Sequence, residues 1–166
     1  MVIRLDAGKI RPGDVFALNA PYNGGTHLPD ITVVSPVFDP EGETILFWVA
    51  SRGHHADVGG TAPGSMTPLA TTVDEEGVLI DNFRLVSGGA FREAALRALL
   101  LDHPYPVRNV EQNIADLRAQ IAANERGAAE LRRMVAEFGL ATVQAYMAHV
   151  QDNAAEEVRR LIGRLS

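Results

Sequence analysis

Apolar residues follow two different periods along this chain of 166 residues, and the period changes near residue 86. Before that point, three β-branched and aromatic runs, 14–20, 30–38 and 44–51, are separated by turn sequences such as "RPGD" and "DPEGE". These runs predict strands, and the short link between the last two predicts a hairpin. The last two are apolar at nearly every position, so we expect both of their faces to be covered in the full protein, with this chain too small to cover them alone. A turn and a short extended piece are expected over 75–81.

After residue 86 the period becomes helical. The segment 89–103 has one apolar face and ends at "HPYP", where proline stops a helix. A second stripe runs from the N-cap residue Asn109 to Val135 in steps of three and four, and a third runs from Val143 to Leu165. We therefore predict an α+β fold. A β-rich lobe with an antiparallel or mixed sheet spans 1–85, and a helical lobe spans 86–166, where two long helices pack as an antiparallel pair.

Composition excludes several classes of protein. The chain has no cysteine, so neither a disulfide framework nor a thiolate metal site is available. The net charge is −6 and the first half carries no basic stripe, so we expect no nucleic-acid partner. No apolar run is long enough to span a bilayer, and the N-terminus does not resemble a signal peptide. We expect a cytoplasmic protein without a membrane partner.

Histidine and aspartate residues gather where the predicted hairpin begins and ends. His27 and Asp30 stand at the start of its first strand, and His54, His55 and Asp57 follow its second. Because a hairpin brings these two ends together, we expect the clusters to meet. Imidazole and carboxylate groups without thiolate suit Zn²⁺, Mn²⁺ or Fe²⁺. A bound ion would lower the pKa of water and polarise a carbonyl, as amide hydrolysis requires.

Simpler roles are open to the same residues. His27 can bond to its own turn, and Asp30 can cap the entry to the strand. Adjacent side chains of a strand alternate between faces, so only one of His54 and His55 can point toward the site.

Two further features have a structural and a functional interpretation. Asn124 interrupts the apolar stripe of the first long helix, and Gln120 and Asn113 lie near its edge. These amides can face a substrate or satisfy one another in the core. The pair Gly24 and Gly25 can form a tight turn or offer backbone amides to a ligand anion.

Long segments of the chain resemble a known family. "PGDVFALNAPYNGGTHLPDITVVSPVF", "WVASRGHHADVGGTAPGSM" and "EEGVLI" over residues 12–80, and the later "DLRAQIAANERGAAEL", are similar to the B subunit of the hydantoinase/5-oxoprolinase family. A subunit of acetone carboxylase belongs to the same group. The resemblance implies an ATP-dependent hydrolase that opens cyclic amides and imides at a C–N bond. A partner A subunit binds ATP and phosphorylates the substrate carbonyl, and the B part completes the reaction.

The resemblance also implies the roles of individual residues. The metal ligands and catalytic residues are His27, Asp30 and His55, with His54 as the substitute and Asp57 as the neighbour that orients a ligand imidazole. Apart from the resemblance, the functional interpretation of the glycine pair and of the helix amides predicts substrate binding by Gly24, Gly25, Gln120 and Asn124.

The chain departs from the family pattern in two respects. It has Asn19-Ala20-Pro21-Tyr22 where the family commonly has "NDPY", so a carboxylate is missing. Family B subunits are several times longer, so we expect a fragment that is inactive alone and works in an oligomeric complex with the A subunit and the rest of B. The alternatives are a non-catalytic assembly module and, as in acetone carboxylase, the carboxylation of a small ketone.

Overall fold

A computed structural model describes residues 10–65 and 67–165. Its helices and strands, in chain order, are β1 (Val15–Leu18), β2 (Asp30–Phe38), β3 (Ile45–His54), α1 (Val73–Glu76), β4 (Phe83–Ser87), β5 (Ala90–Phe91), α2 (Glu93–Leu101), α3 (Val110–Phe138) and α4 (Leu140–Leu165). By their contacts the described residues form two compact units, which divide within α3 between Arg126 and Gly127. The predicted class, a β-rich part followed by long helices, is confirmed.

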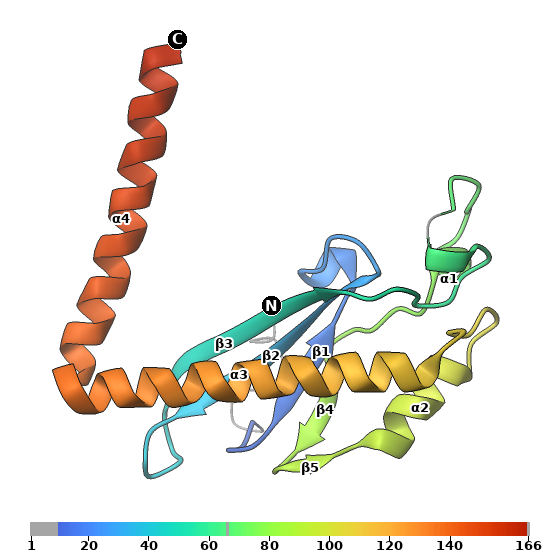
Figure 1. Ribbon diagram of the computed structural model, residues 1–166, viewed down its shortest axis with the longest axis horizontal. Coiled ribbons are helices and arrows are strands. Elements are labelled where there is room, and N and C mark those ends of the chain that lie inside the picture. The colour runs from blue at the N-terminus through green and yellow to red at the C-terminus, as the bar shows by residue number, and fades with distance from the viewer. Residues whose placement is uncertain (1–9, 66, 166) are drawn as a thin grey trace. The chain divides into compact units, whose positions relative to one another are not determined.

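The five strands form one antiparallel sheet in the order β3-β2-β1-β4-β5 (Figure 1). The predicted hairpin is confirmed as β2 and β3, and Asp30 lies opposite His54 in its register. The pair β4 and β5 was not predicted, because only the helix over 89–103 was expected there. Gly88 and Gly89 have φ values of 54° and 86° and form the turn between these strands, so α2 begins only at Glu93.

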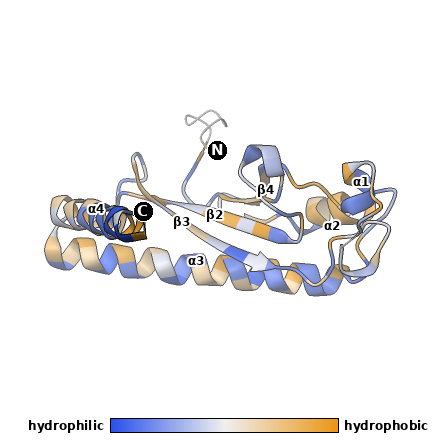
Figure 2. Cartoon of the chain, turned by 90° about the horizontal axis from the view of Figure 1, so that it is seen from above, coloured by the Kyte–Doolittle hydropathy of each residue, from blue (hydrophilic) through white to orange (hydrophobic). Residues whose placement is uncertain are grey.

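The main core lies between the sheet and the helices of the first unit. It contains strand residues together with residues of α2 and α3: Ala17, Ile31, Val33, Leu85, Leu96, Leu100, Ile114 and Leu117. A smaller cluster of Ile10, Phe16, Leu18, Val34 and Phe38 forms a second core. Hydrophilic and hydrophobic residues alternate in bands along α3 (Figure 2).

The two strands of the hairpin differ in how far they are covered. All residues of β2 after Asp30 are buried, which confirms the expectation for that strand. In β3, Trp48, Ala50, Arg52 and His54 are exposed. Within the described residues one face of this strand is therefore uncovered, because its alternate side chains face away from the core, and the expected cover of both faces stays a prediction for the larger assembly.

The second unit contains the end of α3 and all of α4. Gly139 has a φ of 81° and separates the two helices, which confirms the predicted break. Val143 is buried, whereas the rest of the apolar stripe of α4 is exposed at Tyr146, Val150, Val158, Leu161 and Leu165. The predicted antiparallel pairing of the two long helices stays a prediction, because α3 extends through both units.

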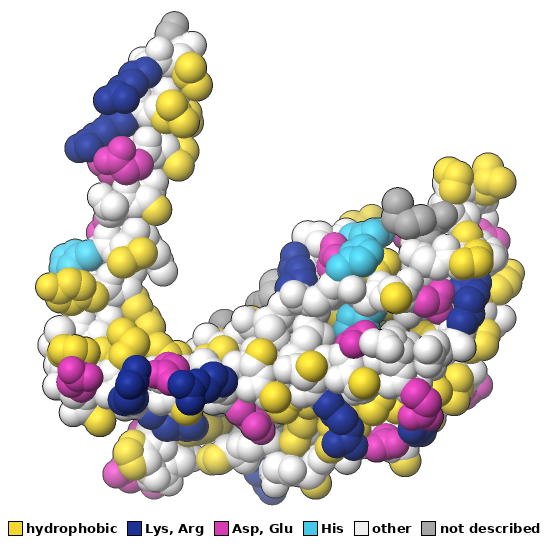
Figure 3. Space-filling model, in the orientation of Figure 1, with side chains coloured by type: hydrophobic (Ala, Val, Ile, Leu, Met, Phe, Trp, Pro, Cys, Tyr) yellow, Lys and Arg dark blue, Asp and Glu magenta, His cyan; other side chains and the backbone are white. Residues whose placement is uncertain are grey.

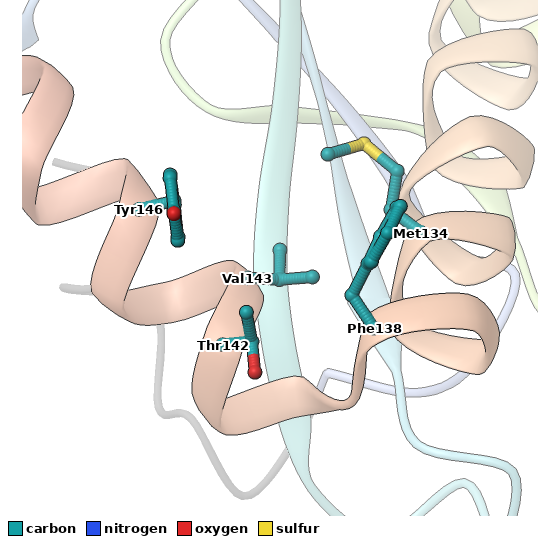
Figure 4. A pocket seen from close by; sticks show the side chains of 5 residues that line it. All are labelled: Met134, Phe138, Thr142, Val143 and Tyr146. Carbon is teal, nitrogen blue, oxygen red and sulfur yellow. The ribbon is translucent and has the colours of Figure 1, made fainter.

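An apolar hollow of about 320 Å³ also lies in the second unit. Its walls are the side chains of Met134, Phe138, Thr142, Val143 and Tyr146 (Figure 4). None of these residues carries an imidazole or a carboxylate, so the hollow offers no ligand set for a metal ion.

No helix among the described residues is long and apolar enough to cross a membrane.

Candidate metal centre

Two histidines and one aspartate meet at the end of the β2–β3 hairpin. His54 Nδ1 lies 2.8 Å from Asp30 Oδ1, and His27 Nδ1 lies 3.5 Å from Asp30 Oδ2. The centres of the two imidazole rings are 5.7 Å apart. Figure 3 shows histidine side chains beside an acidic one at the surface of this part of the molecule. The predicted meeting of the two clusters is confirmed for these three residues.

The spacing of these three groups is compatible with one metal ion. One ligand atom from each residue can be chosen so that all of them lie within 4.8 Å of one another. Metal–ligand bonds of about 2.1 Å place two ligands of one ion about 3.0 to 4.2 Å apart, so small side-chain rotations would suffice. Two imidazoles and one carboxylate suit zinc, manganese or iron and leave coordination positions open.

The electrostatics favour a charged carboxylate in this cluster. The hydrogen bond with His54 is the main cause that lowers the pKa of Asp30, and the charges of His54 and His27 add to it. Burial acts in the opposite direction and is outweighed. Asp30 is therefore ionised at neutral pH, which is the form that binds a cation.

A buried amide supports the loop that carries His27. Asn19 Nδ2 donates to the carbonyl oxygens of Leu28 and Val78, both at 2.9 Å, and Asn19 Oδ1 accepts from the Ile80 amide at 2.6 Å. The same loop passes so close to Asn19 that a Cβ atom at Gly25 would lie 2.0 Å from its carbonyl oxygen. Asn19 is not among the predicted site residues. The available signal was a polar residue directly after an apolar strand.

His55 lies on the opposite face of the hairpin from His54. It is 1% exposed, and its Nδ1 accepts a hydrogen bond from Asn113 Nδ2 at 3.2 Å. Its Nε2 donates to Gln120 Oε1 at 3.1 Å, and burial lowers the pKa of the ring, so His55 is held neutral. The prediction that the two histidines point to opposite faces is confirmed. The one that joins His27 and Asp30 is His54, our substitute ligand, and not His55.

Asp57 also lies apart from the three-residue cluster. Its carboxylate accepts hydrogen bonds from the Arg108 backbone N–H at 3.0 Å, from Arg108 Nη1 at 2.5 Å and from the Gly59 N–H at 3.1 Å. It therefore fastens the segment after β3 to the residue two positions before α3. Its predicted role toward a ligand imidazole has no counterpart in these contacts.

The residues assigned to substrate binding occupy two places. Gln120 and Asn124 are buried, and their side-chain amides donate to backbone carbonyls of β2 and β3. The two roles left open for these amides were binding a substrate and satisfying one another in the core. Their contacts are those of core residues, but the amides bond to the backbone of the sheet and not to each other. Gly24 has a φ of 106° and ends a 3₁₀ turn, and Gly25 follows it. A role of these four residues in binding substrate stays a prediction.

A hollow of about 300 Å³ adjoins the cluster. It is lined by His27, Leu28, Ser65, Thr67, Pro68 and Glu76. The hydroxyl of Ser65 already bonds to the Val58 N–H at 3.0 Å and the Gly59 carbonyl at 2.8 Å, which are structural contacts. The hollow has the size of a site for a small molecule, with one candidate metal ligand in its wall.

The sequence of the chain matches a known family. All 166 residues match the model of the family described as Hydantoinase B/oxoprolinase, and the chain belongs to that family. The predicted resemblance is confirmed. The chain is 46% identical over 162 residues to 5-oxoprolinase 1 of Arabidopsis thaliana, an alignment that covers 92% of this chain and 13% of the relative. The chain thus spans a small part of the length of that enzyme.

Two solved structures have the same fold. The crystal structure of the ATP-dependent caprolactamase from Pseudomonas jessenii has a TM-score of 0.79 at 29% identity, covering 96% of this chain and 27% of that one. The nucleotide-free structure of acetone carboxylase, an enzyme of ATP-dependent acetone carboxylation, has a TM-score of 0.71 at 26% identity. That match covers 84% of this chain and 17% of the other.

Proposed function

We propose that this chain contributes the metal centre of an ATP-dependent enzyme that hydrolyses a cyclic amide or imide. The observation that carries the proposal is the cluster of His27, Asp30 and His54 beside a hollow that fits a small molecule. The names of the relatives support the substrate class, because 5-oxoproline and caprolactam are both cyclic amides.

Each residue of the cluster and of the hollow has a role in this proposal. A divalent ion held by His27, Asp30 and His54 would lower the pKa of a water molecule and polarise a substrate carbonyl. Asp30 supplies the negative charge of the ligand set, and its contacts with both imidazoles orient their Nδ1 atoms. The hollow beside His27 would take the ring of the substrate, and the carboxylate of Glu76 in its wall can accept the hydrogen bond of a lactam N–H.

The ATP-dependent step belongs, in this proposal, to other parts of the assembly. An A-type partner subunit would use ATP to phosphorylate and so activate the carbonyl, and the remainder of a B subunit would complete the complex. The names of the ATP-dependent caprolactamase and of acetone carboxylase support an ATP-dependent step, and this chain covers 27% and 17% of the chains it matches there, so most of each neighbour lies outside the matched part. Carboxylation of a small ketone is the second candidate function, favoured by the structural match to acetone carboxylase.

Metal analysis of the purified chain tests the proposal directly. The chain is loaded with Mn²⁺, dialysed and analysed for metal alongside His27→Ala, His54→Ala and the control His149→Ala, whose ring contacts Tyr146 on α4. We expect one ion per chain in the wild type and the control, and a loss in the two cluster variants. A wild type without metal, or one whose metal survives both cluster substitutions, contradicts the proposal.

Activity separates the two candidate reactions. The chain is combined with an A-type subunit, the remaining part of a B subunit and ATP, and ring opening of 5-oxoproline and caprolactam is compared with carboxylation of acetone. Hydrolysis of either lactam supports the first candidate, and carboxylation alone supports the second.

A further inference from the structure

Gln120 on α3 contacts both strands directly behind the candidate metal centre. Its Nε2 donates to the Ile31 carbonyl at 3.0 Å and the Ser51 carbonyl at 3.3 Å, and its Oε1 accepts from His55 Nε2 at 3.1 Å. Ile31 follows the candidate ligand Asp30 in the chain, and His55 follows the candidate ligand His54. One buried amide therefore touches the residue next to each of these two ligands.

The strand beside Gln120 leaves room for this amide. Gly53 lies opposite Ile31 in the hairpin register, directly before His54. A Cβ atom at Gly53 would lie 3.2 Å from Gln120 Cδ and 3.3 Å from its Nε2. A side chain at position 53 would crowd the Gln120 amide, so the glycine at 53 provides the space that the glutamine at 120 occupies.

The alternation of strand side chains connects the two faces of the hairpin. Asp30 and His54 project from one face, whereas Ile31, Gly53 and His55 turn toward α3 on the other. Since Asp30 and His54 are register partners, any shift of either strand end separates their side chains. Contacts on the α3 face therefore decide where these two ligands lie.

The buried polar groups in this contact are fully used. The two N–H bonds of the Gln120 amide and its oxygen all have partners, and both ring nitrogens of His55 are engaged through Gln120 and Asn113. Such a network has a high cost when one member is removed, because the partners stay buried without a hydrogen bond. An apolar side chain at position 120 could pack against the strands but could not make these hydrogen bonds, so it would not fix the positions of Ile31 and His55.

We infer that Gln120 is a positioning residue that holds Asp30 and His54 in metal-binding geometry through the Ile31 carbonyl and His55. This inference rests on the proposed metal site. It assigns α3 a part in the function of the site although no α3 side chain belongs to the ligand cluster.

Asn124 supplies a matched control on the same helix. Its amide is 1% exposed and donates to the carbonyls of Val33 at 3.0 Å and Val49 at 3.4 Å, so it docks α3 on the same two strands. These contacts lie farther along the hairpin from the ligands. Gln120→Met and Asn124→Leu each replace a buried amide by an apolar side chain of similar size, and both should lower the thermal unfolding temperature.

Two measurements on the full chain test the inference. Mn²⁺ affinity is measured by calorimetry, and the imidazole ¹⁵N shifts of His54 are measured by NMR without metal at one fixed pH. We expect Gln120→Met to weaken Mn²⁺ binding about tenfold or more and Asn124→Leu less than about twofold. Only Gln120→Met should change the His54 shifts, because its hydrogen bond with Asp30 is lost.

Equal effects of the two variants on Mn²⁺ affinity, or unchanged His54 shifts in Gln120→Met, would overturn the positioning role. If the wild type binds no Mn²⁺, the proposed metal function fails by itself. The NMR comparison then still decides whether Gln120 fixes the geometry of His54 and Asp30.

Discussion

Replacing Asn19 by leucine should destabilise the chain and loosen the candidate metal centre together. The Asn19 side chain is fully buried and makes three hydrogen bonds, to the Leu28 carbonyl, the Val78 carbonyl and the Ile80 amide. Leucine has a similar size, so it fills the space but satisfies none of these backbone groups. All three partners are main-chain groups. They remain in the variant, and each loses its hydrogen bond with the Asn19 side chain.

The magnitude follows from those three bonds. A hydrogen bond contributes about 1 kcal/mol net, so three amount to about 3 kcal/mol. Each buried backbone group left without a partner adds to the loss of stability, whereas the greater hydrophobicity of leucine reduces that loss. We expect a loss of about 3 kcal/mol in the free energy of unfolding, a large fraction of the stability of a domain.

Urea unfolding and metal affinity measure the two consequences. The control is Asn23→Ala, which removes one exposed bond to Asp81 of 2.8 Å and should cost less than about 0.5 kcal/mol. Since Leu28 directly follows His27, the Asn19 variant should also bind Mn²⁺ more weakly than the Asn23 variant. An Asn19→Leu chain within about 1 kcal/mol of the wild type would refute the reasoning, because three buried bonds cannot then be contributing their usual value.

Two other substitutions test the surroundings of the site. Burial alone would raise the pKa of Asp57, but the backbone N–H and guanidinium of Arg108 lower it overall, so its folded value lies below the unfolded value of about 3.9. The stability from this pair is therefore present at neutral pH and is lost progressively as the pH falls below about 4. Urea unfolding should show Asp57→Asn destabilising more at pH 7 than at pH 3; an equal effect at both would contradict the pairing. Gly25→Ala should destabilise the chain because its Cβ would lie 2.0 Å from the Asn19 carbonyl oxygen, whereas Gly163→Ala, which meets nothing within 4 Å, should be neutral or stabilising in thermal unfolding.

Much of the sheet and the candidate site followed from local patterns. The β-branched runs at 30–38 and 44–51 and the short turn between them are sufficient to specify a hairpin, and antiparallel pairing then brings Asp30 to the end of the other strand. Helical periodicity likewise predicted α3 and α4, because spacing by three and four residues depends only on the geometry of the helix. The Hydantoinase B/oxoprolinase family was also evident from motifs in the chain itself.

Other features depended on contacts between distant parts of the chain. The strands β4 and β5 are short, and β4 is held by pairing with β1, so the sequence around them did not distinguish them from the start of a helix. The choice between His54 and His55 is a matter of one residue in register, and a shift of one residue exchanges the two faces of a strand.

The sequence by itself determined the period of each element, the family and the group of residues from which a metal site can be built. Only the tertiary structure decided which histidine joins His27 and Asp30, and what the amides of α3 do. Gln120 meets His55 across 65 residues and Asn124 meets the Val33 carbonyl across 91. A polar residue in an apolar stripe shows that a partner is needed, but the identity of that partner is set by the packing of helix on sheet, which local sequence does not encode.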